Sequence, residues 1–327
     1  MPQVSIIIAT HNRPHLLPRA VKSAGAAGKD VEIVVVDDAS EAETFRVCQK
    51  FSGIRYVRVE RNRRLGGARN LGILASVGEL ISFLDDDDVR LPHSLDAQIE
   101  ALASAPEAGF VYGQALHGDQ NGAPLGSFYP AACPQGDVFW ELLKWNFVPC
   151  PTVVFRRDCL HRVGLLDEAM PGVEDWDLWI RIAELYPVVA VERPVAVWRR
   201  STPDSGQYTS RHAEMLCLCA RLLRERWLAL PRAAGASPAQ LSSVRRQFAE
   251  HVAEQLAWEA ARALQSAQPG HAMKQVSAAA RLTPWGFARR AMRLLTMRIF
   301  SGRGRRSAVA ADDGLHLPHG RPGRHES

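Results

Sequence analysis

Four consecutive aspartates, Asp85, Asp86, Asp87 and Asp88, are the residues whose types and spacing most clearly suggest chemistry. They follow the apolar residues 80–84, and a short continuous apolar segment is typical of a buried strand. Two carboxylates about 4 Å apart repel each other by roughly 4 kcal/mol at an effective dielectric constant of about 20. A bound cation offsets this repulsion, and Mg²⁺ and Mn²⁺ prefer carboxylate and phosphate oxygens as ligands. We therefore expect a divalent-cation site here, with an acidic surface loop as the alternative.

Apolar and amphipathic segments alternate along the first 110 residues. Strands are expected over residues 4–9, 31–36, 54–59 and 80–84. Helices are expected after Pro14, over residues 41–51 and 67–76, and from Pro92 onward. This alternation predicts an α/β fold with a parallel, doubly wound sheet. Ligands of such sheets bind beyond the carboxyl ends of the strands, so the pair Asp37 and Asp38 is expected at the same edge as the four aspartates.

The pattern changes after residue 112. Gly, Pro and Asn residues cluster over 113–134, which predicts a hairpin or a long loop. Further strands are expected over residues 152–156, 188–191 and 195–198, the last two separated by Pro194. Further helices are expected over residues 137–145, 174–185, 213–230, 237–265 and 273–300. We therefore divide the chain into an α/β domain over 1–210, a helical region over 211–300 and a disordered basic tail over 301–327.

Three further polar segments could contribute to a ligand site. Asp37 and Asp38 could hydrogen-bond a nucleotide base or ribose, although an acidic pair also caps a following helix well. The turn over residues 9–13 has the same two interpretations. Residues 61–70 combine paired glycines with several arginines, so this segment could bind a phosphate or be a solvated basic loop. It lacks the Lys-Ser/Thr of a P-loop.

Another acidic segment opens the helix expected over residues 174–185. Glu174, Asp175 and Asp177 lie in its first turn, where acidic side chains interact favourably with the helix dipole. The functional alternative is a carboxylate base that takes a proton from an attacking hydroxyl group. These residues alone do not decide between the two roles.

In their order along the chain, these motifs resemble those of the family 2 glycosyltransferases, which are inverting enzymes of the GT-A fold that use nucleotide sugars. The matching segments are VSIIIATHNR (4–13), VVVDDAS (34–40), ARNLG (68–72), GELISFLDDDD (78–88) and EDWDLWIR (174–181). The resemblance covers about three fifths of the chain. It implies a GT-A fold with a Rossmann-like, mainly parallel sheet flanked by helices, followed by a helical C-terminal arm. Residues 1–210 would be the catalytic domain.

The resemblance also implies roles for individual residues. Those implied to bind the nucleotide-sugar donor are Ala9, His11, Asp38, Arg69 and Asp86. Asp85 and Asp87 match the D-x-D motif that holds Mg²⁺ or Mn²⁺, with Asp87 as the direct ligand. Asp175 matches the catalytic base, which would deprotonate an acceptor hydroxyl for a single displacement at the anomeric carbon. The donor is expected to be a UDP-sugar, and the acceptor a saccharide or a lipid-linked hydroxyl.

One position departs from the family pattern. Many relatives place a histidine after the strand that matches residues 195–198, whereas Arg199 and Arg200 stand here, with no histidine before His212. An arginine could therefore meet the donor diphosphate directly. Two other functions stay open on the sequence alone. A sugar-1-phosphate nucleotidyltransferase shares the sheet and the metal, and a non-catalytic module could bind a nucleotide sugar.

Charge is distributed unevenly along the chain. Residues 1–210 carry 21 basic and 27 acidic side chains, and residues 211–327 carry 19 and 8. Residues 281–306 contain eight arginines and no acid in an amphipathic pattern. This pattern predicts contact with an anionic membrane surface, with a helix packed on its own domain as the alternative. Nucleic-acid binding is not expected, because aromatic residues are not interleaved with the arginines.

Cysteine usage and segment lengths bear on location. The six cysteines show no C-x-x-C spacing, which favours a reducing compartment. A basic leader and an apolar run of about 20 residues are both missing from the sequence. We therefore expect a cytoplasmic protein, peripheral on the inner face of the cytoplasmic membrane.

Overall fold

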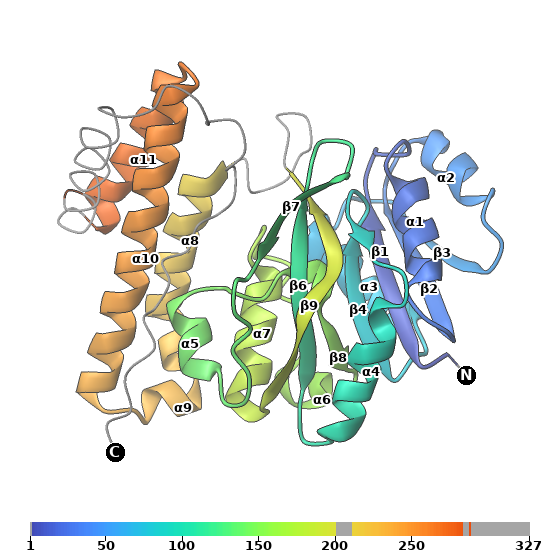
Figure 1. Ribbon diagram of the computed structural model, residues 1–327, viewed down its shortest axis with the longest axis horizontal. Coiled ribbons are helices and arrows are strands. Elements are labelled where there is room, and N and C mark those ends of the chain that lie inside the picture. Colours follow the sequence, from blue (N-terminus) through green and yellow to red (C-terminus); the bar gives the residue numbers. More distant parts are fainter. Residues whose placement is uncertain (1, 201–210, 284–287, 289–327) are drawn as a thin grey trace.

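The computed structural model describes residues 2–200, 211–283 and 288. A nine-stranded mixed sheet lies at its centre, with helices on both faces (Figure 1). The strands are β1 (Val4–Thr10), β2 (Val31–Asp38), β3 (Ile54–Val59), β4 (Leu80–Asp85), β5 (Val89–Arg90), β6 (Phe110–Gly118), β7 (Pro124–Tyr129), β8 (Val154–Arg156) and β9 (Val188–Arg199). Their order is β3-β2-β1-β4-β8-β6-β9-β5, and β7 pairs with β6.

Strands β1 to β4 form the parallel half of the sheet. Ala9 in β1 lies opposite Val36 in β2 and Asp85 in β4. The carboxyl ends of these three strands therefore align, and the turns that follow them open at the same edge. This register confirms the expected meeting of the two acidic clusters at one edge of the sheet.

The first four helices are α1 (Leu17–Ala26), α2 (Ala42–Cys48), α3 (Arg64–Ala75) and α4 (Ser94–Ser104). Of these, α1 and α3 pack on β1 and β2 of this half, α2 packs on α1, and α4 packs on β6 and β9. Side chains of β1 alternate between two hydrophobic cores, so that Ile6 and Ile8 pack with α1 and α4, and Ile7 packs with α3. Gly72 permits the close approach of α3, because a Cβ atom at this position would lie 2.3 Å from Ile7 Cγ2.

The second half of the sheet mixes strand directions. β8 is antiparallel to β4 and β6, whereas β6 and β9 are parallel. The hairpin predicted over residues 113–134 is present as β6 and β7. The prediction of two strands separated by Pro194 is wrong, because β9 is continuous. The register between β6 and β9 shifts on both sides of Gln114, which faces Pro194, and such an irregularity accommodates a proline.

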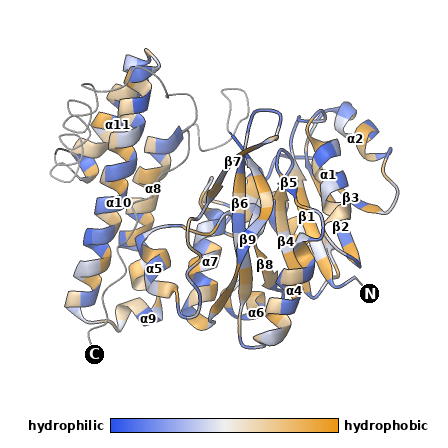
Figure 2. Cartoon of the chain, in the orientation of Figure 1, coloured by the Kyte–Doolittle hydropathy of each residue, from blue (hydrophilic) through white to orange (hydrophobic). Residues whose placement is uncertain are grey.

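The remaining helices lie beyond the other half of the sheet (Figure 1). They are α5 (Phe139–Lys144), α6 (Cys159–Val163), α7 (Glu174–Leu185), α8 (His212–Glu225), α9 (Pro231–Ala234), α10 (Pro238–Gln265) and α11 (Pro269–Leu282), with 3-10 turns at Cys150–Thr152 and Trp227–Ala229. Helix α10 packs on α5 and α11, and α11 packs on α8. Figure 2 shows the strands as mainly apolar and these helices as mixed. Side chains of α8 and α10, such as Leu216 and Val252, belong to the same hydrophobic core as Ile7 of the sheet.

The C-terminal predictions are only partly covered by the described residues. The helix predicted over 213–230 ends at Glu225, and the helix predicted over 273–300 begins earlier, at Pro269. Most of the basic segment 281–306 and the tail 301–327 lie outside the described residues, and the division of the chain at residue 210 stays a prediction. Within the described part, no helix is both long and apolar enough to cross a membrane.

Candidate active site

Three of the four aspartates at the end of β4 form a carboxylate cluster. One oxygen each from Asp85, Asp87 and Asp88 lies within 4.8 Å of the others. The Asp85 side chain is 28% exposed, whereas Asp87 and Asp88 are buried. Oδ2 of Asp88 is enclosed and has no hydrogen-bond partner among the described residues. Three converging carboxylates of this kind fit the oxygen ligands that a hard divalent cation prefers.

Asp86 lies outside this cluster. Its carboxylate is fully buried and accepts a hydrogen bond of 2.7 Å from Thr10 Oγ1. Nη2 of Arg13 lies 2.7 Å from its other oxygen, and Nη1 of Arg13 lies 3.1 Å from Asp87. The predicted contact of Asp86 with a ribose or sugar stays a prediction, and in this structure both oxygens of the carboxylate have partners from the protein itself. Asp86 holds Arg13 against the cluster.

Two more arginines contact the cluster. Nη2 of Arg69 lies 2.7 Å from Asp85. Nη1 of Arg199 lies 3.5 Å from Asp87, and the backbone N–H of Arg199 donates a 2.8 Å hydrogen bond to Oδ1 of Asp88. Arg199 stands where many relatives of the resembled family have a histidine. The structure therefore brings this departure from the pattern into direct contact with the acidic cluster.

Burial raises the pKa of every enclosed aspartate in this segment. The pKa of Asp86 rises to about 7, although the charge of Arg13 opposes the shift. The pKa values of Asp87 and Asp88 are raised first by burial and then by the neighbouring carboxylates. A dication would favour the ionised forms and lower these pKa values. The cluster is therefore electrostatically unfavourable by itself and complementary to a cation.

The first turn of α7 lies beside the cluster. Arg69 bridges the two, because its Nη1 lies 3.0 Å from Glu174 while its Nη2 contacts Asp85. Glu174 is buried, and burial raises its pKa to about 7. Asp175 is half-buried, its pKa is raised by burial, and the charges of Arg69 and Asp85 also act on it. Asp175 is therefore the one acid of Glu174, Asp175 and Asp177 that is not fully buried.

The predicted donor residues Ala9, His11 and Asp38 lie at the same sheet edge. Oδ1 of Asp38 accepts a 2.7 Å hydrogen bond from the N–H of Arg63. The Asp38 carbonyl lies 2.7 Å from Nδ1 of His11, and burial raises the pKa of the Asp38 carboxyl. The carboxylate of Asp37 accepts from three groups of the protein itself, which belong to Ser40, Tyr56 and Arg58.

Sequence reasoning gave no individual role to four residues of this site. They are Thr10, Arg13, Asp88 and Glu174. Each lies inside or next to a motif that sequence analysis selected, which was the available signal. Their contacts were not predictable from spacing, because Arg13 meets Asp87 across 74 positions of the chain.

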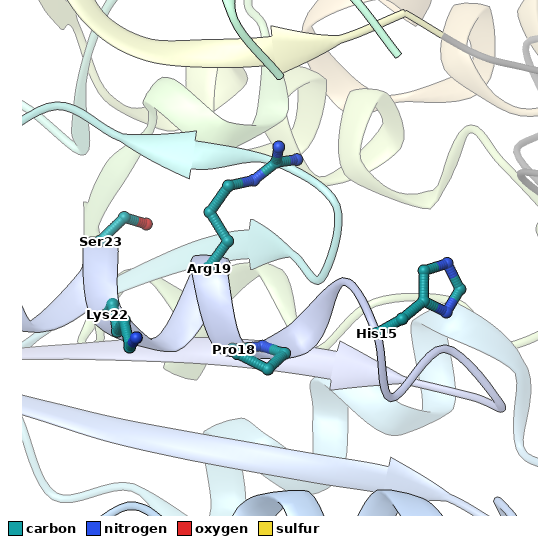
Figure 3. A pocket seen from close by; sticks show the side chains of 5 residues that line it. All are labelled: His15, Pro18, Arg19, Lys22 and Ser23. Carbon is teal, nitrogen blue, oxygen red and sulfur yellow. The ribbon is translucent and has the colours of Figure 1, made fainter. Parts of the chain in front are cut away.

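A surface pocket of about 530 Å³ lies on α1, outside the carboxylate cluster. It is lined by His15, Pro18, Arg19, Lys22 and Ser23 (Figure 3). Figure 3 shows the Arg19 side chain extending away from α1. Its Nη2 donates a 2.8 Å hydrogen bond to the carbonyl of Asp87, and its Nη1 contacts the carbonyl of Asn121. Arg19 therefore supports the aspartate turn from the side of α1.

The family model and three curated relatives that this sequence matches are all described as glycosyltransferases. Residues 5–164 match the family model described as "Glycosyl transferase family 2". Uncharacterized glycosyltransferase RC0461 of Rickettsia conorii is 30% identical over 219 residues, covering 64% of this chain and 36% of that protein. Uncharacterized glycosyltransferase MJ1057 of Methanocaldococcus jannaschii is 26% identical over 234 residues, covering 69% of this chain and 80% of that protein.

A third relative has a specific name. The Escherichia coli protein UDP-Glc:alpha-D-GlcNAc-diphosphoundecaprenol beta-1,3-glucosyltransferase WfaP is 29% identical over 187 residues, covering 56% of this chain and 70% of that protein. The chain covers only 36% of the length of the two Rickettsia proteins that it matches first.

Two solved structures share the architecture. Staphylococcus aureus TarS 1-349 in complex with UDP-GlcNAc matches with a TM-score of 0.53 at 14% identity, over 85% of this chain and 91% of that chain. The mannosyltransferase PcManGT from Pyrobaculum calidifontis, in complex with GDP-Man and Mn²⁺, matches with a TM-score of 0.54 at 17% identity, over 92% and 81%. At these identities the likeness concerns the fold, and it confirms the predicted GT-A fold.

Proposed function

We propose that this protein transfers a sugar from a nucleotide-sugar donor, expected to be a UDP-sugar, to an acceptor hydroxyl, because residues 5–164 match the family model described as "Glycosyl transferase family 2". The observation that carries the proposal is a convergence at one sheet edge. The carboxylates of Asp85, Asp87 and Asp88 lie together there, and Arg69 links Asp85 to Glu174 in the turn that also carries the partly exposed Asp175. A cation at such a site stabilises a departing diphosphate, and a base beside it activates an acceptor hydroxyl.

We assign the cation to the carboxylate cluster, with Mg²⁺ or Mn²⁺ as the ion. Asp85 and Asp87 are joined by Asp88, whose enclosed Oδ2 lacks a hydrogen-bond partner among the described residues. When bound, the ion supplies positive charge that stabilises the diphosphate leaving group. Arg13 and Arg199, already in contact with Asp87, supply further positive charge next to it. Ala9, His11 and Asp38 would line the base and ribose pocket.

We propose an inverting single displacement. Asp175 accepts the proton of an acceptor hydroxyl, whose oxygen forms a bond to the anomeric carbon while the bond from that carbon to the diphosphate oxygen breaks. The electron pair of the broken bond leaves with the diphosphate. Attack from the face opposite the diphosphate converts an α-linked donor into a β-linked product.

A panel of nucleotide sugars tests the function. The purified protein is incubated with Mn²⁺ and each of several UDP- and GDP-sugars, and both thermal shift and release of the nucleoside diphosphate are measured. We expect one UDP-sugar to raise the melting temperature and to be slowly hydrolysed. Pyrophosphate formation from a nucleoside triphosphate and a sugar 1-phosphate would indicate a nucleotidyltransferase instead. If a nucleotide sugar binds but no nucleoside diphosphate is released, whichever acceptor is added, the protein would be a binding module.

Replacing Asp88 by asparagine is expected to weaken Mn²⁺ binding at least about tenfold, a loss that even indirect partners of metal ligands can cause. Asparagine keeps an oxygen that can accept from the N–H of Arg199, so the local backbone is retained. Isothermal titration calorimetry and the electron paramagnetic resonance signal of Mn²⁺ measure the affinity. Asp96→Asn is the control, because the Asp96 side chain lies on α4 and is 53% exposed. Equal affinity in Asp88→Asn and wild type would remove Asp88 from the ligand set.

We also propose that residues within 281–306 contact an anionic membrane surface. The support is that residues 281–306 contain eight arginines and no acidic residue, and that the name of one relative specifies a lipid-diphosphate acceptor. Deleting residues 284–327 keeps the described helix α11 and should strongly reduce pelleting with vesicles that contain phosphatidylglycerol. Vesicles of pure phosphatidylcholine are the control. Unchanged pelleting of the shortened protein would contradict the membrane contact.

A further inference from the structure

A buried carboxylate joins the first turn of α7 to the helices beyond residue 211. Asp177 lies two positions after Asp175 and is fully buried. Its Oδ1 accepts a 3.0 Å hydrogen bond from Nε1 of Trp227, and Nε of Arg226 lies 3.4 Å from the same oxygen. Its Oδ2 accepts from Nε of Arg181, on the same helix, at 2.8 Å. Two of the three partners of Asp177 therefore come from the end of α8 and the 3-10 turn that follows.

Arg226 also holds the segment that leads into α7. Its Nη1 lies 2.6 Å from Oδ2 of Asp167, so one guanidinium group contacts residues on both sides of the turn that carries Asp175. A planar guanidinium with several donors can bridge two carboxylates in this way, whereas a lysine ammonium has a single centre. The position of this turn is therefore linked directly to the end of α8.

Aromatic packing fixes the same turn from behind. Trp176 is the residue next to Asp175. Its ring centroid lies 4.9 Å from that of Trp227 and 6.4 Å from that of Phe248 on α10. Trp227 is completely buried. Both neighbours of Asp175 on its C-terminal side, Trp176 and Asp177, thus take their packing or their hydrogen bonds from the helices beyond residue 211.

We infer that Arg226 and Trp227 are positioning residues, which set the placement of Asp175 through Asp177 and Trp176. The inference rests on the proposed role of Asp175 as the base. A base must lie within hydrogen-bond reach of the acceptor hydroxyl, and displacements of about 1 Å can cost up to a hundredfold in rate. The helices beyond residue 211 would then contribute to the rate of sugar transfer and not only to stability.

The variant Trp227→Phe tests this inference, because it keeps an aromatic ring while removing the N–H donor to Asp177 and part of the indole volume. We expect kcat to fall about tenfold while the donor KM and Kd stay within twofold. Titration calorimetry gives the concentration of protein that binds donor, and kcat is calculated from that concentration. Trp258→Phe is the matched control, since Trp258 lies on α10 and contacts Arg262 instead. A loss of kcat equal to that of the control, or an accompanying loss of donor affinity, would overturn the positioning role.

The variant Arg226→Met gives a second test, which leaves Trp227 in place in case Trp227→Phe destabilises the protein. It keeps most of the stem and removes both ion pairs, and the same fall in kcat is expected. Arg224→Met is its control, because the Arg224 side chain is 66% exposed and pairs with its neighbour Glu225. If Asp175→Asn abolishes transfer but neither test variant changes kcat, only the positioning inference fails. If the wild type turns over no nucleotide sugar, the proposed function fails and the inference fails with it.

Discussion

Replacing Asp175 by asparagine is expected to lower the rate of sugar transfer about a thousandfold, within the range that general bases contribute. Asparagine has the same shape but cannot accept the proton of the acceptor hydroxyl. Asp175 is half-buried, and the charge of Arg69 acts on its carboxyl group. Because asparagine has nearly the same size, the substitution removes this charge without opening a cavity. The measurement is the initial rate of product formation at saturating donor, with donor affinity determined separately by calorimetry and expected to stay within about twofold of wild type.

Asp158→Asn is a suitable control for this experiment. The Asp158 side chain is 94% exposed on the surface, so its substitution should leave both rate and affinity unchanged. A turnover rate in Asp175→Asn equal to that of the wild type would show that another group accepts the proton. Loss of donor binding together with the rate would show instead that Asp175 organises the donor site.

Replacing Asp87 by alanine is expected to abolish the effect of Mn²⁺ on donor binding. Asp87 belongs to the carboxylate cluster and contacts both Arg13 and Arg199. We expect donor affinity in the presence of Mn²⁺ to fall at least about a hundredfold, the upper end of the loss caused by removing even outer partners of metal ligands. Titration calorimetry with and without Mn²⁺ measures both effects.

Asp87→Asn separates charge from size in the same experiment. It keeps the volume of the side chain, so a loss of Mn²⁺ dependence in both variants would identify the carboxylate charge as the cause. Asp30→Asn, at an exposed position directly before β2, controls for a change of net charge. Equal donor affinity of the wild-type protein with and without Mn²⁺ would count against a metal at this site.

The parallel half of the fold was predictable because its strands are continuous apolar segments that end in polar turns. The strands over residues 4–9, 31–36, 54–59 and 80–84 agree with β1 to β4 to within two residues. Strand β9 was predicted as two strands because Pro194 usually interrupts a ladder, and the compensating register shift depends on its partner β6. The two-residue strand β5 gives no periodic signal at all.

The site was predictable to the level of which turns meet, but not to the level of which side chains converge. Four identical residues in sequence cannot show that Asp86 points to Thr10 while Asp88 joins the cluster. Burial and long-range partners make that difference. The same holds for Arg199, whose contact with the cluster depends on the pairing of β9 with β6 and β5. The assigned roles of the site residues stay predictions until the variants are measured.

The aromatic contact between Trp176 and Trp227 has a practical consequence for protein engineering. A fragment ending near residue 210 would uncover one side of Trp176 and the buried carboxylate of Asp177, and exposed apolar surface of this kind promotes aggregation. Chimeras that exchange the C-terminal helices between related proteins would have to carry over the matching indole and guanidinium partners. Shuffling by whole helices would otherwise yield insoluble or inactive hybrids.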